Sequence, residues 1–228
     1  MEVGARQPVI QAVLNIAHNA TQALAERIAE GLPRAFRALA ADQGPAAAKA
    51  IMTTDPFPKE AAARVSINGV DITVGGMAKG SGMIEPMMAT MLGFITTDAN
   101  VPAPLLTRAL SEVVHDTFNA ITADGECSTN DCVLLMASGA SDVEITDASD
   151  PALIEPLRTV AGHLAREIVR GGEGATKLLT VRVTGAASLD EARRAAQERV
   201  QSEAAAIASL VIAVNLVADT VQSILESQ

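Results

Sequence analysis

A β-hairpin signal in the first half of the chain is the feature that most constrains the fold. Apolar and polar residues alternate over residues 65–67 and again over residues 70–74, with Asn68-Gly69 between the two runs. Alternation with a period of two indicates half-buried strands, and Asn-Gly strongly favours a two-residue type I′ turn. The sequence therefore predicts two antiparallel strands joined by that turn.

Strand and helix patterns alternate through the middle of the chain. The strand patterns are at residues 91–95, 133–136 and 178–183, and the helical patterns are at residues 45–52, 103–121 and 151–170. Such alternation is typical of proteins in which helices pack on a sheet. The predicted fold class is therefore α/β, with layers of sheet and helix.

Both ends of the chain carry helical patterns. Apolar residues at helical spacing over residues 9–32 predict a helix that Gly31 and Pro33 end. The pattern from residue 189 onward is also interpreted as helical, including the apolar run at residues 204–218. Because that run is shorter than the ~20 residues needed to cross a bilayer, it is expected to be buried or covered by a partner.

The composition argues against several classes of function. With 17 Lys+Arg against 27 Asp+Glu, the net charge of −10 disfavours nucleic-acid binding. The chain has no Trp or Tyr and only 4 Phe, so aromatic stacking of bases is not expected. An apolar fraction of 49% excludes global disorder. The first residues show no secretory signal, so a cytoplasmic location is expected.

Neither the cysteines nor the histidines have the spacing of a metal site. Cys127 and Cys132 have no histidine neighbours, and their separation fits neither a zinc knuckle nor a redox Cys-x-x-Cys motif. His18, His115 and His163 lie in separate predicted helices. We therefore expect reduced thiols and no metal ligands.

A glycine-dense segment, residues 75–82, follows the predicted hairpin directly. Glycine allows a backbone to approach a ligand closely or to adopt positive φ. The segment's lysine, Lys79, precedes Gly80, so the spacing of a phosphate-binding loop is not met and nucleotide binding is not predicted. The chain then runs to Thr90 and continues directly into a predicted apolar strand. An ordinary loop is unusual at this place in a sequence.

Several separated blocks of residues, in one order, carry a more specific signal. The blocks are Ala50-Ile51-Met52-Thr53-Thr54-Asp55 with Pro58-Lys59, Gly75-Gly76-Met77-Ala78-Lys79-Gly80-Ser81-Gly82-Met83-Ile84, Met88-Ala89-Thr90-Met91-Leu92, Ile95-Thr96-Thr97-Asp98-Ala99, Phe118-Asn119-Ala120-Ile121-Thr122, Asp124-Gly125 with Ser128-Thr129-Asn130-Asp131, Gly172-Glu173-Gly174-Ala175-Thr176-Lys177, and Val183-Thr184-Gly185-Ala186. With these blocks, residues 28–201 resemble the family of bifunctional ornithine acetyltransferase / glutamate N-acetyltransferase enzymes of arginine biosynthesis.

The resemblance implies the self-cleaving N-terminal-nucleophile type of α/β fold. The chain would cleave itself between Ala89 and Thr90, and the new N-terminal Thr90 would be the catalytic nucleophile. A threonine hydroxyl is a weak nucleophile, and the α-amine freed on the same residue can accept its proton. The acetyl group of N-acetylornithine would pass to Thr90 and then to glutamate.

The resemblance also implies which residues meet the substrate. Lys79 would contact substrate in the acyl site, Thr53 or Thr54 would line that site, and Glu173 would meet the substrate's amino group. A cation and an anion on opposite sides suit a zwitterionic amino acid. Taken alone, Lys79 and Glu173 would be read as solvated loop residues and Thr90 as a buried threonine that starts a strand. Residues 128–131 are interpreted as a structural turn that holds neighbouring backbone.

The same resemblance bears on cofactors and partners. The cysteines and the composition indicate no metal or organic cofactor, and the resemblance allows acetyl-CoA as an alternative acetyl donor. The expected partners are the small molecules N-acetylornithine and glutamate, with no nucleic acid and no membrane, and the cleaved pieces are expected to form a homo-oligomer. The expected organisation is one α/β domain, with a helical flank at residues 1–30, a family-like core at residues 31–200 and a helical tail at residues 201–228.

Departures from the family pattern keep an alternative open. The family places an oxyanion-hole Thr-Gly pair upstream of the position of Gly31. After the position of Ala186 it has a Pro-Asn-Trp-Gly-Arg segment and a final Asn and Ser/Thr. All of these features are absent from this sequence. Met87 stands where the family usually has asparagine. The alternative is an uncleaved, catalytically incomplete scaffold or binding module derived from this core. A related self-cleaving aminopeptidase would instead hydrolyse peptides.

Overall fold

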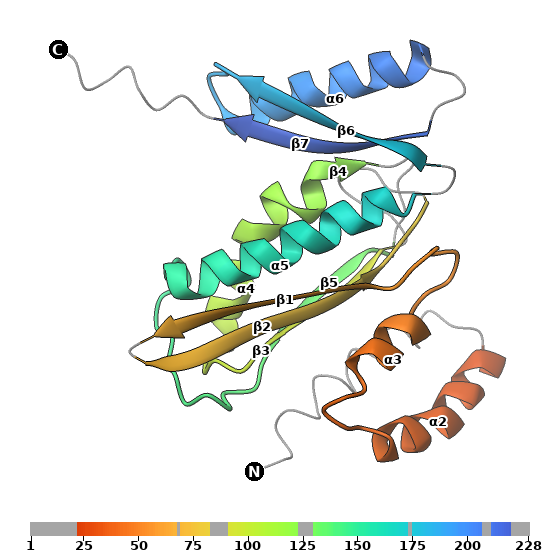
Figure 1. Cartoon of the computed structure of the whole chain (residues 1–228), viewed down its shortest axis with the longest axis vertical. Helices are drawn as coiled ribbons and strands as arrows, with labels where there is room; N and C mark the ends of the chain where they lie inside the picture. The colour runs from red at the N-terminus through yellow and green to blue at the C-terminus, as the bar shows by residue number, and fades with distance from the viewer. Residues whose placement is uncertain are drawn as a thin grey trace.

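Two β-sheets with helices packed on them form most of the described part of the chain (Figure 1). The structure is a computed structural model. The ranges that it describes are residues 22–67, 69–82, 91–122, 130–172, 175–206 and 211–219. The mixed α/β class predicted from the sequence is confirmed.

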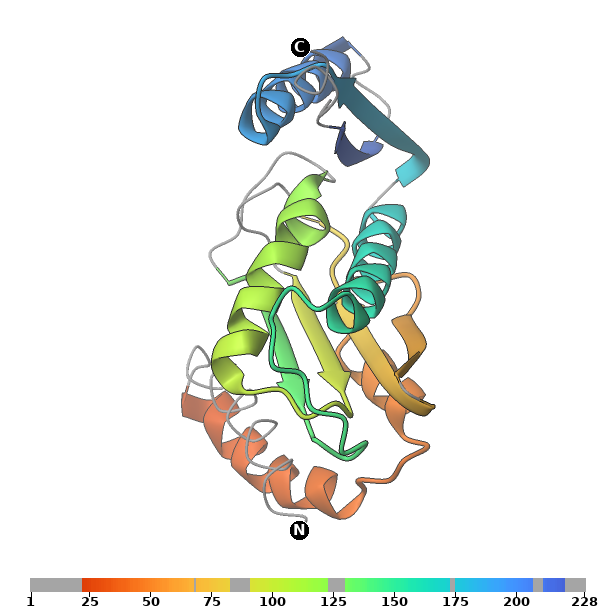
Figure 2. The same ribbon diagram turned by 90° about the vertical axis from the view of Figure 1, so that its left-hand side faces the viewer.

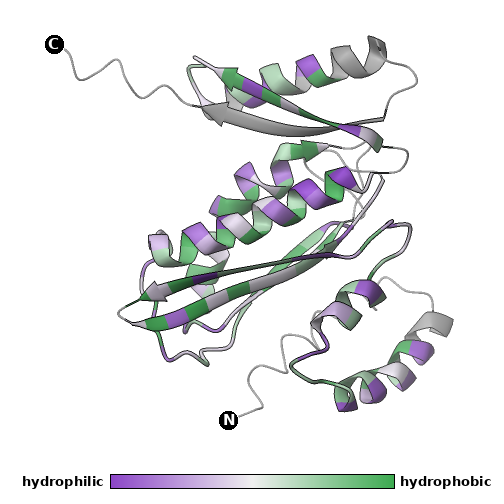
Figure 3. Cartoon of the chain, in the orientation of Figure 1, coloured by the Kyte–Doolittle hydropathy of each residue, from purple (hydrophilic) through white to green (hydrophobic). Residues whose placement is uncertain are grey.

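The predicted hairpin is present at the edge of the larger sheet. β1 (Lys59–Ile67) and β2 (Val70–Lys79) pair antiparallel along their length and are joined by a two-residue connection. Hydrophobic and hydrophilic residues alternate along β2 (Figure 3). Gly69 in the connection has a φ of +84°, which glycine adopts without strain. Asn68 lies outside the described residues, so the type of turn stays a prediction.

The larger sheet is completed by two further strands and covered by two helices on one face. β3 (Leu92–Thr97) pairs antiparallel with β2, and β5 (Cys132–Ala137) pairs parallel with β3, which gives the order β1-β2-β3-β5. α4 (Ala103–Asp116) and α5 (Pro151–Arg170) lie side by side on this face (Figures 1 and 2). The strand predictions at residues 91–95 and 133–136 and the helix prediction at residues 151–170 are confirmed.

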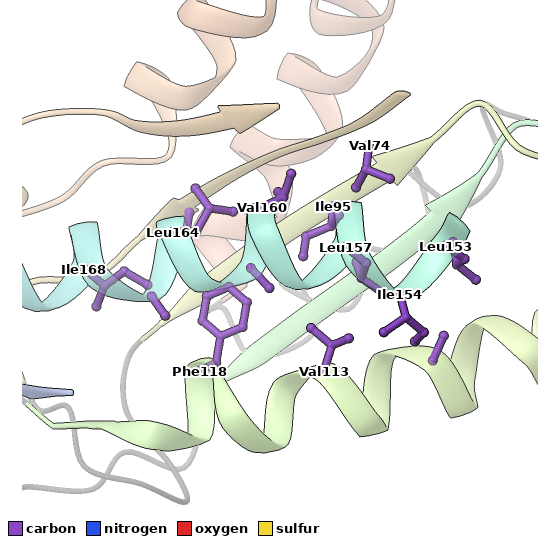
Figure 4. Close-up of a cluster of buried hydrophobic side chains, with 14 of the residues drawn as sticks. Val74, Ile95, Val113, Phe118, Leu153, Ile154, Leu157, Val160, Leu164 and Ile168 are labelled. Atoms are coloured by element: carbon purple, nitrogen blue, oxygen red, sulfur yellow. The ribbon is translucent and has the colours of Figure 1, made fainter. Parts of the chain in front are cut away.

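The main hydrophobic core fills the space between this sheet and the two helices (Figure 4). Apart from Phe118 and Met91, its buried side chains are aliphatic, as expected for a chain with so few aromatic residues. α5 contributes a stripe of fully buried side chains at helical spacing, namely Leu153, Leu157, Val160, Leu164 and Ile168. This stripe fixes α5 against the sheet.

Gly76 allows α5 to pack closely on β2. A Cβ at this position would lie 3.0 Å from side-chain atoms of Val160 and Leu164 and 3.1 Å from the carbonyl oxygen of Phe94. Residues 75–79 of the glycine-dense segment belong to β2. Here glycine leaves room for a helix.

A smaller sheet lies beyond the C-terminal end of α5 (Figure 1). It has the order β4-β7-β6, formed by β4 (Ile121–Thr122), β7 (Val211–Asp219) and β6 (Ala175–Thr184). α6 (Leu189–Ala206) connects β6 to the parallel strand β7 and packs on both. The predicted strand at residues 178–183 is confirmed as part of β6.

The predicted helical tail is wrong over residues 211–219, which form β7. This run is rich in valine, with isoleucine and leucine, and β-branched side chains favour strands. Strand β7 pairs with β6 on one side and β4 on the other, and an apolar run this short does not distinguish a strand from a helix by periodicity. Residues 220–228 lie outside the described part.

The helix predicted over residues 103–121 is too long. The helical conformation ends at Asp116, since Thr117 has a φ of −121° and a ψ of −90°. A short 3₁₀ turn, η1 (Phe118–Ala120), follows, and Ile121 then pairs with Asn215 in the smaller sheet. Strand pairing with a distant segment outweighs the local helical pattern.

The predicted end of the first helix is also wrong. α2 (Gln22–Arg37) continues through Gly31 and Pro33, and the Arg37 side chain donates to the Pro33 carbonyl at 3.0 Å. Gly31 is not among the described glycines with the positive φ that ends a helix. The short helix α3 (Gly44–Ala50) lies near its predicted position, and residues 1–21 lie outside the described part.

We expect Gly76→Ala to destabilise the fold by about 1–3 kcal/mol, because the added methyl group overpacks the contact between β2 and α5. Gly75→Ala is the matched control, since its Cβ would meet only the Thr96 hydroxyl, at 3.9 Å. Urea unfolding followed by circular dichroism measures both variants. Equal unfolding midpoints for the two variants would contradict the packing role of Gly76.

Candidate functional site

Lys79, the last residue of β2, is a buried cation. It is 7% exposed, and its ammonium group lies 3.5 Å from the Thr53 hydroxyl. Within the part of the chain that the structure describes, Lys79 makes no ion pair. A buried ammonium is costly without a charged partner. An anion bound next to this ammonium would offset that cost.

The loop between α3 and β1 brings two threonines to the end of β2. Thr54 and Ser81 share a hydrogen bond between their hydroxyl oxygens at 2.5 Å. Thr53 lies beside Lys79, as described above, and both threonines are exposed while Ser81 is buried. The cluster thus places the hydroxyl groups of two exposed threonines near the buried Lys79.

Asp55 is the acceptor at the centre of this cluster. Its carboxylate accepts hydrogen bonds from the Lys59 ammonium at 2.5 Å, the Gly80 amide at 2.7 Å and the Thr53 amide at 3.2 Å. Burial by itself would raise the pKa of Asp55, but these hydrogen bonds outweigh it and lower the pKa below its ordinary value. Asp55 is therefore an anion in the folded chain.

Lys59 completes the buried pair. Its side chain is inaccessible to solvent, and its ammonium lies 5.0 Å from the centre of the Phe57 ring. Asp55 and Lys59 stand in one of the blocks that carry the family resemblance, but the resemblance assigns neither residue a role. In a sequence, an acidic and a basic residue four positions apart are only a weak indication of a structural role. On exposed surfaces such pairs contribute little to stability.

The start of β3 lies beside the end of β2. Lys79 pairs with Leu92 across the two antiparallel strands, and the amide of Met91 donates to the Asp131 carboxylate at 2.6 Å. Asp131 thereby holds the amide of Met91, the residue before Leu92. It thus holds a backbone amide, as expected for residues 128–131, but residues 128 and 129 lie outside the described part, so the turn stays a prediction.

The structure brings together three of the predicted site residues, Thr53, Thr54 and Lys79. The other predicted site residues lie outside the described part of the chain and are Ala89, Thr90 and Glu173. The described residues next to them are Met91, at the start of β3, and Gly172, after α5. The roles of all these residues stay predictions.

Cys132, on β5, is a free and partly exposed thiol. Burial and the neighbouring negative charge of Asp131 raise its pKa, which disfavours the reactive thiolate. Cys127 lies outside the described residues. Over the described ranges, no three His, Cys, Asp or Glu side chains are grouped to hold a metal ion. None of the helices described there is sufficiently long and apolar to span a membrane.

Comparison with known proteins places these residues in a family. Residues 20–211 match the ArgJ family. The chain is 54% identical over 175 residues to the arginine biosynthesis bifunctional protein ArgJ of Symbiobacterium thermophilum, which covers 75% of this chain and 44% of the relative. It is 49% identical over 171 residues to the protein of the same name from Methylococcus capsulatus, which covers 74% of this chain and 42% of that relative.

A solved structure is also similar. The crystal structure of arginine biosynthesis bifunctional protein argJ from Bacillus halodurans is 42% identical, with a TM-score of 0.43, and the match covers 46% of this chain and 50% of that one. The chain spans less than half the length of the two curated relatives described above. Because the family match extends over residues 20–211, the chain belongs to the ArgJ family.

Proposed function

We propose that this chain carries the acyl-threonine site of an acetyltransferase of arginine biosynthesis, which moves the acetyl group of N-acetylornithine to glutamate. Family membership and relatives named as arginine biosynthesis bifunctional proteins support the reaction class. The observation that carries the proposal is the buried ammonium of Lys79, with threonine hydroxyls beside it and the start of β3 opposite it.

Lys79 binds the carboxylate of the amino-acid substrate in this proposal. The Thr53 hydroxyl, its described partner at 3.5 Å, is neutral and does not offset the cost of burying the charge. A substrate carboxylate would add a charge-assisted hydrogen bond, which is roughly twice as strong as a neutral one. The site is thus selective for an anion, and Glu173 would meet the substrate's amino group.

Thr90 is the proposed nucleophile after cleavage of the Ala89-Thr90 bond. The freed α-amine, with an ordinary pKa of about 7.7–8.0, accepts the hydroxyl proton as the oxygen attacks the acetyl carbonyl carbon. The carbon–nitrogen bond to ornithine then breaks, and the leaving amine takes the proton. The glutamate amine next attacks the acyl-threonine, which restores the hydroxyl and releases N-acetylglutamate.

Asp131 has a positioning role in this scheme. Its carboxylate holds the amide of Met91, the residue that follows Thr90 in the chain. A fixed amide at that position restrains the backbone next to the reacting hydroxyl and amine. The proposal needs no metal or organic cofactor, with acetyl-CoA as an alternative acetyl donor. It further includes a homo-oligomer of cleaved pieces in the cytoplasm.

The alternative proposal is an uncleaved scaffold or binding module with the same core. It follows from the absence of the family's Thr-Gly pair upstream of Gly31, because loss of one oxyanion-hole donor typically costs about 10²- to 10³-fold in rate. In this case Thr90 would keep its peptide bond to Ala89 and would have no free amine to act as a base. Cleavage of the chain therefore distinguishes the two proposals.

We expect intact-mass spectrometry of the purified chain to show two fragments, one ending at Ala89 and one beginning at Thr90. Thr90→Ala should remain a single chain because it lacks the hydroxyl that attacks the peptide bond. Thr107→Ala, an exposed change on α4, is the matched control and should cleave like the parent. A single intact chain in the parent would favour the scaffold.

We also expect Lys79→Met to raise the KM for N-acetylornithine at least tenfold, because hydrogen bonds to charged groups contribute about 1.5–3 kcal/mol. Ornithine release measures this effect. Lys49→Met removes an exposed lysine on α3 and is the matched control. An unchanged KM in the Lys79 variant would show that this ammonium does not bind the substrate carboxylate.

A further inference from the structure

The Asp55–Lys59 ion pair has no chemical step in the proposed reaction, although it is fully buried. Its two side chains are 0% exposed, whereas every other described ion pair has a side chain at least one-third exposed. Removing two charges from water is costly, and a buried pair is by itself weak evidence for stability. Its position in the fold therefore calls for another explanation.

Asp55 connects the two segments on either side of the Lys79 ammonium. It accepts from the amide of Gly80, the residue directly after Lys79, and from the amide of Thr53, whose hydroxyl contacts the Lys79 ammonium. Gly80 has a φ of +151°, a backbone conformation that side chains disfavour. The carboxylate thus holds an unusual backbone turn immediately after the lysine.

Lys59 extends the same connection to the end of α5. A Cβ on Gly171 would lie 3.1 Å from both the Cε and the Nζ of Lys59, so the lysine is packed directly against this glycine. The backbone of Lys59 also pairs with Ala78 on β2. The ion pair therefore ties together the Thr53 loop, the end of β2 and the end of α5.

We propose that the Asp55–Lys59 ion pair positions Lys79 for substrate binding. The pair keeps the Lys79 ammonium buried beside Thr53 because it fixes the backbone at Ala78, before Lys79, and at Gly80, after it. Asp55 and Lys59 are positioning residues that do not touch the substrate. The substrate part of this inference rests on the function proposed above for Lys79, whereas the geometric part is independent of activity.

The test measures how fast an amine-reactive N-hydroxysuccinimide ester modifies Lys79 in the full chain, by peptide mass spectrometry relative to the exposed Lys49. Asp55→Asn removes the charge with little change in shape and should raise Lys79 labelling at least tenfold. Asp71→Asn is the matched control, because it breaks an exposed pair with Arg64 at 3.8 Å and should change nothing. A folded Asp55→Asn variant with Lys79 still protected would overturn the proposal.

A second variant separates positioning from stability. Asp55→Asn combined with Lys59→Met leaves neither member of the pair as an unpaired buried charge, so the melting temperature should recover toward that of the parent. We expect Lys79 labelling to stay raised in the double variant, because the Gly80 and Thr53 amides still lack their shared carboxylate. If labelling returned to the parent level together with stability, the pair would be merely structural and the proposal would be wrong.

A parallel measurement of N-acetylornithine binding keeps the two proposals apart. If the parent binds, the double variant should bind at least tenfold more weakly. Raised Lys79 labelling in both variants, with no binding to the parent, would support the positioning by Asp55 and Lys59 and count against the proposed function. Equal binding by the parent and the double variant would overturn the positioning role.

Discussion

The packing of α5 on the larger sheet is the interaction on which the rest of the structure depends. A stripe of aliphatic side chains on this helix is buried against the strands, and the glycine at position 76 lets the two backbones approach closely. The helix and β2 therefore end near each other. Gly80, directly after β2, and Gly171, directly after α5, are the residues that the buried pair of Asp55 and Lys59 joins.

Local patterns in the sequence predict the elements whose partners are close in the chain. The hairpin follows from its alternation and its Asn-Gly pair, and α5 follows from its apolar spacing, so both could be found without tertiary information. β7 could not, because its pairing with β6 and β4 is a tertiary feature and its apolar run is equally compatible with a buried helix. The early end assigned to α2 failed because glycine and proline are statistical rather than absolute helix breakers.

In the candidate site, too, some residues could be predicted from the sequence and others depend on tertiary contacts. Thr53, Thr54 and Lys79 were predicted through resemblance to a family, and the fold brings all three to the end of β2. The role of Asp55 could not be predicted, because the amide that it binds most closely belongs to a residue 25 positions away. Lys59 likewise meets Gly171, which is remote in the sequence. Contacts of this kind exist only once the sheet and α5 have assembled.

In the function proposed above, the buried Lys79 ammonium at the end of β2 binds a substrate carboxylate. Calorimetric titration of the full chain with N-acetylornithine and with its carboxamide, which differ only in that group, measures the contribution of this contact. We expect the carboxylate form to bind at least tenfold more tightly than the amide. Equal affinities for the two compounds would contradict this role of Lys79.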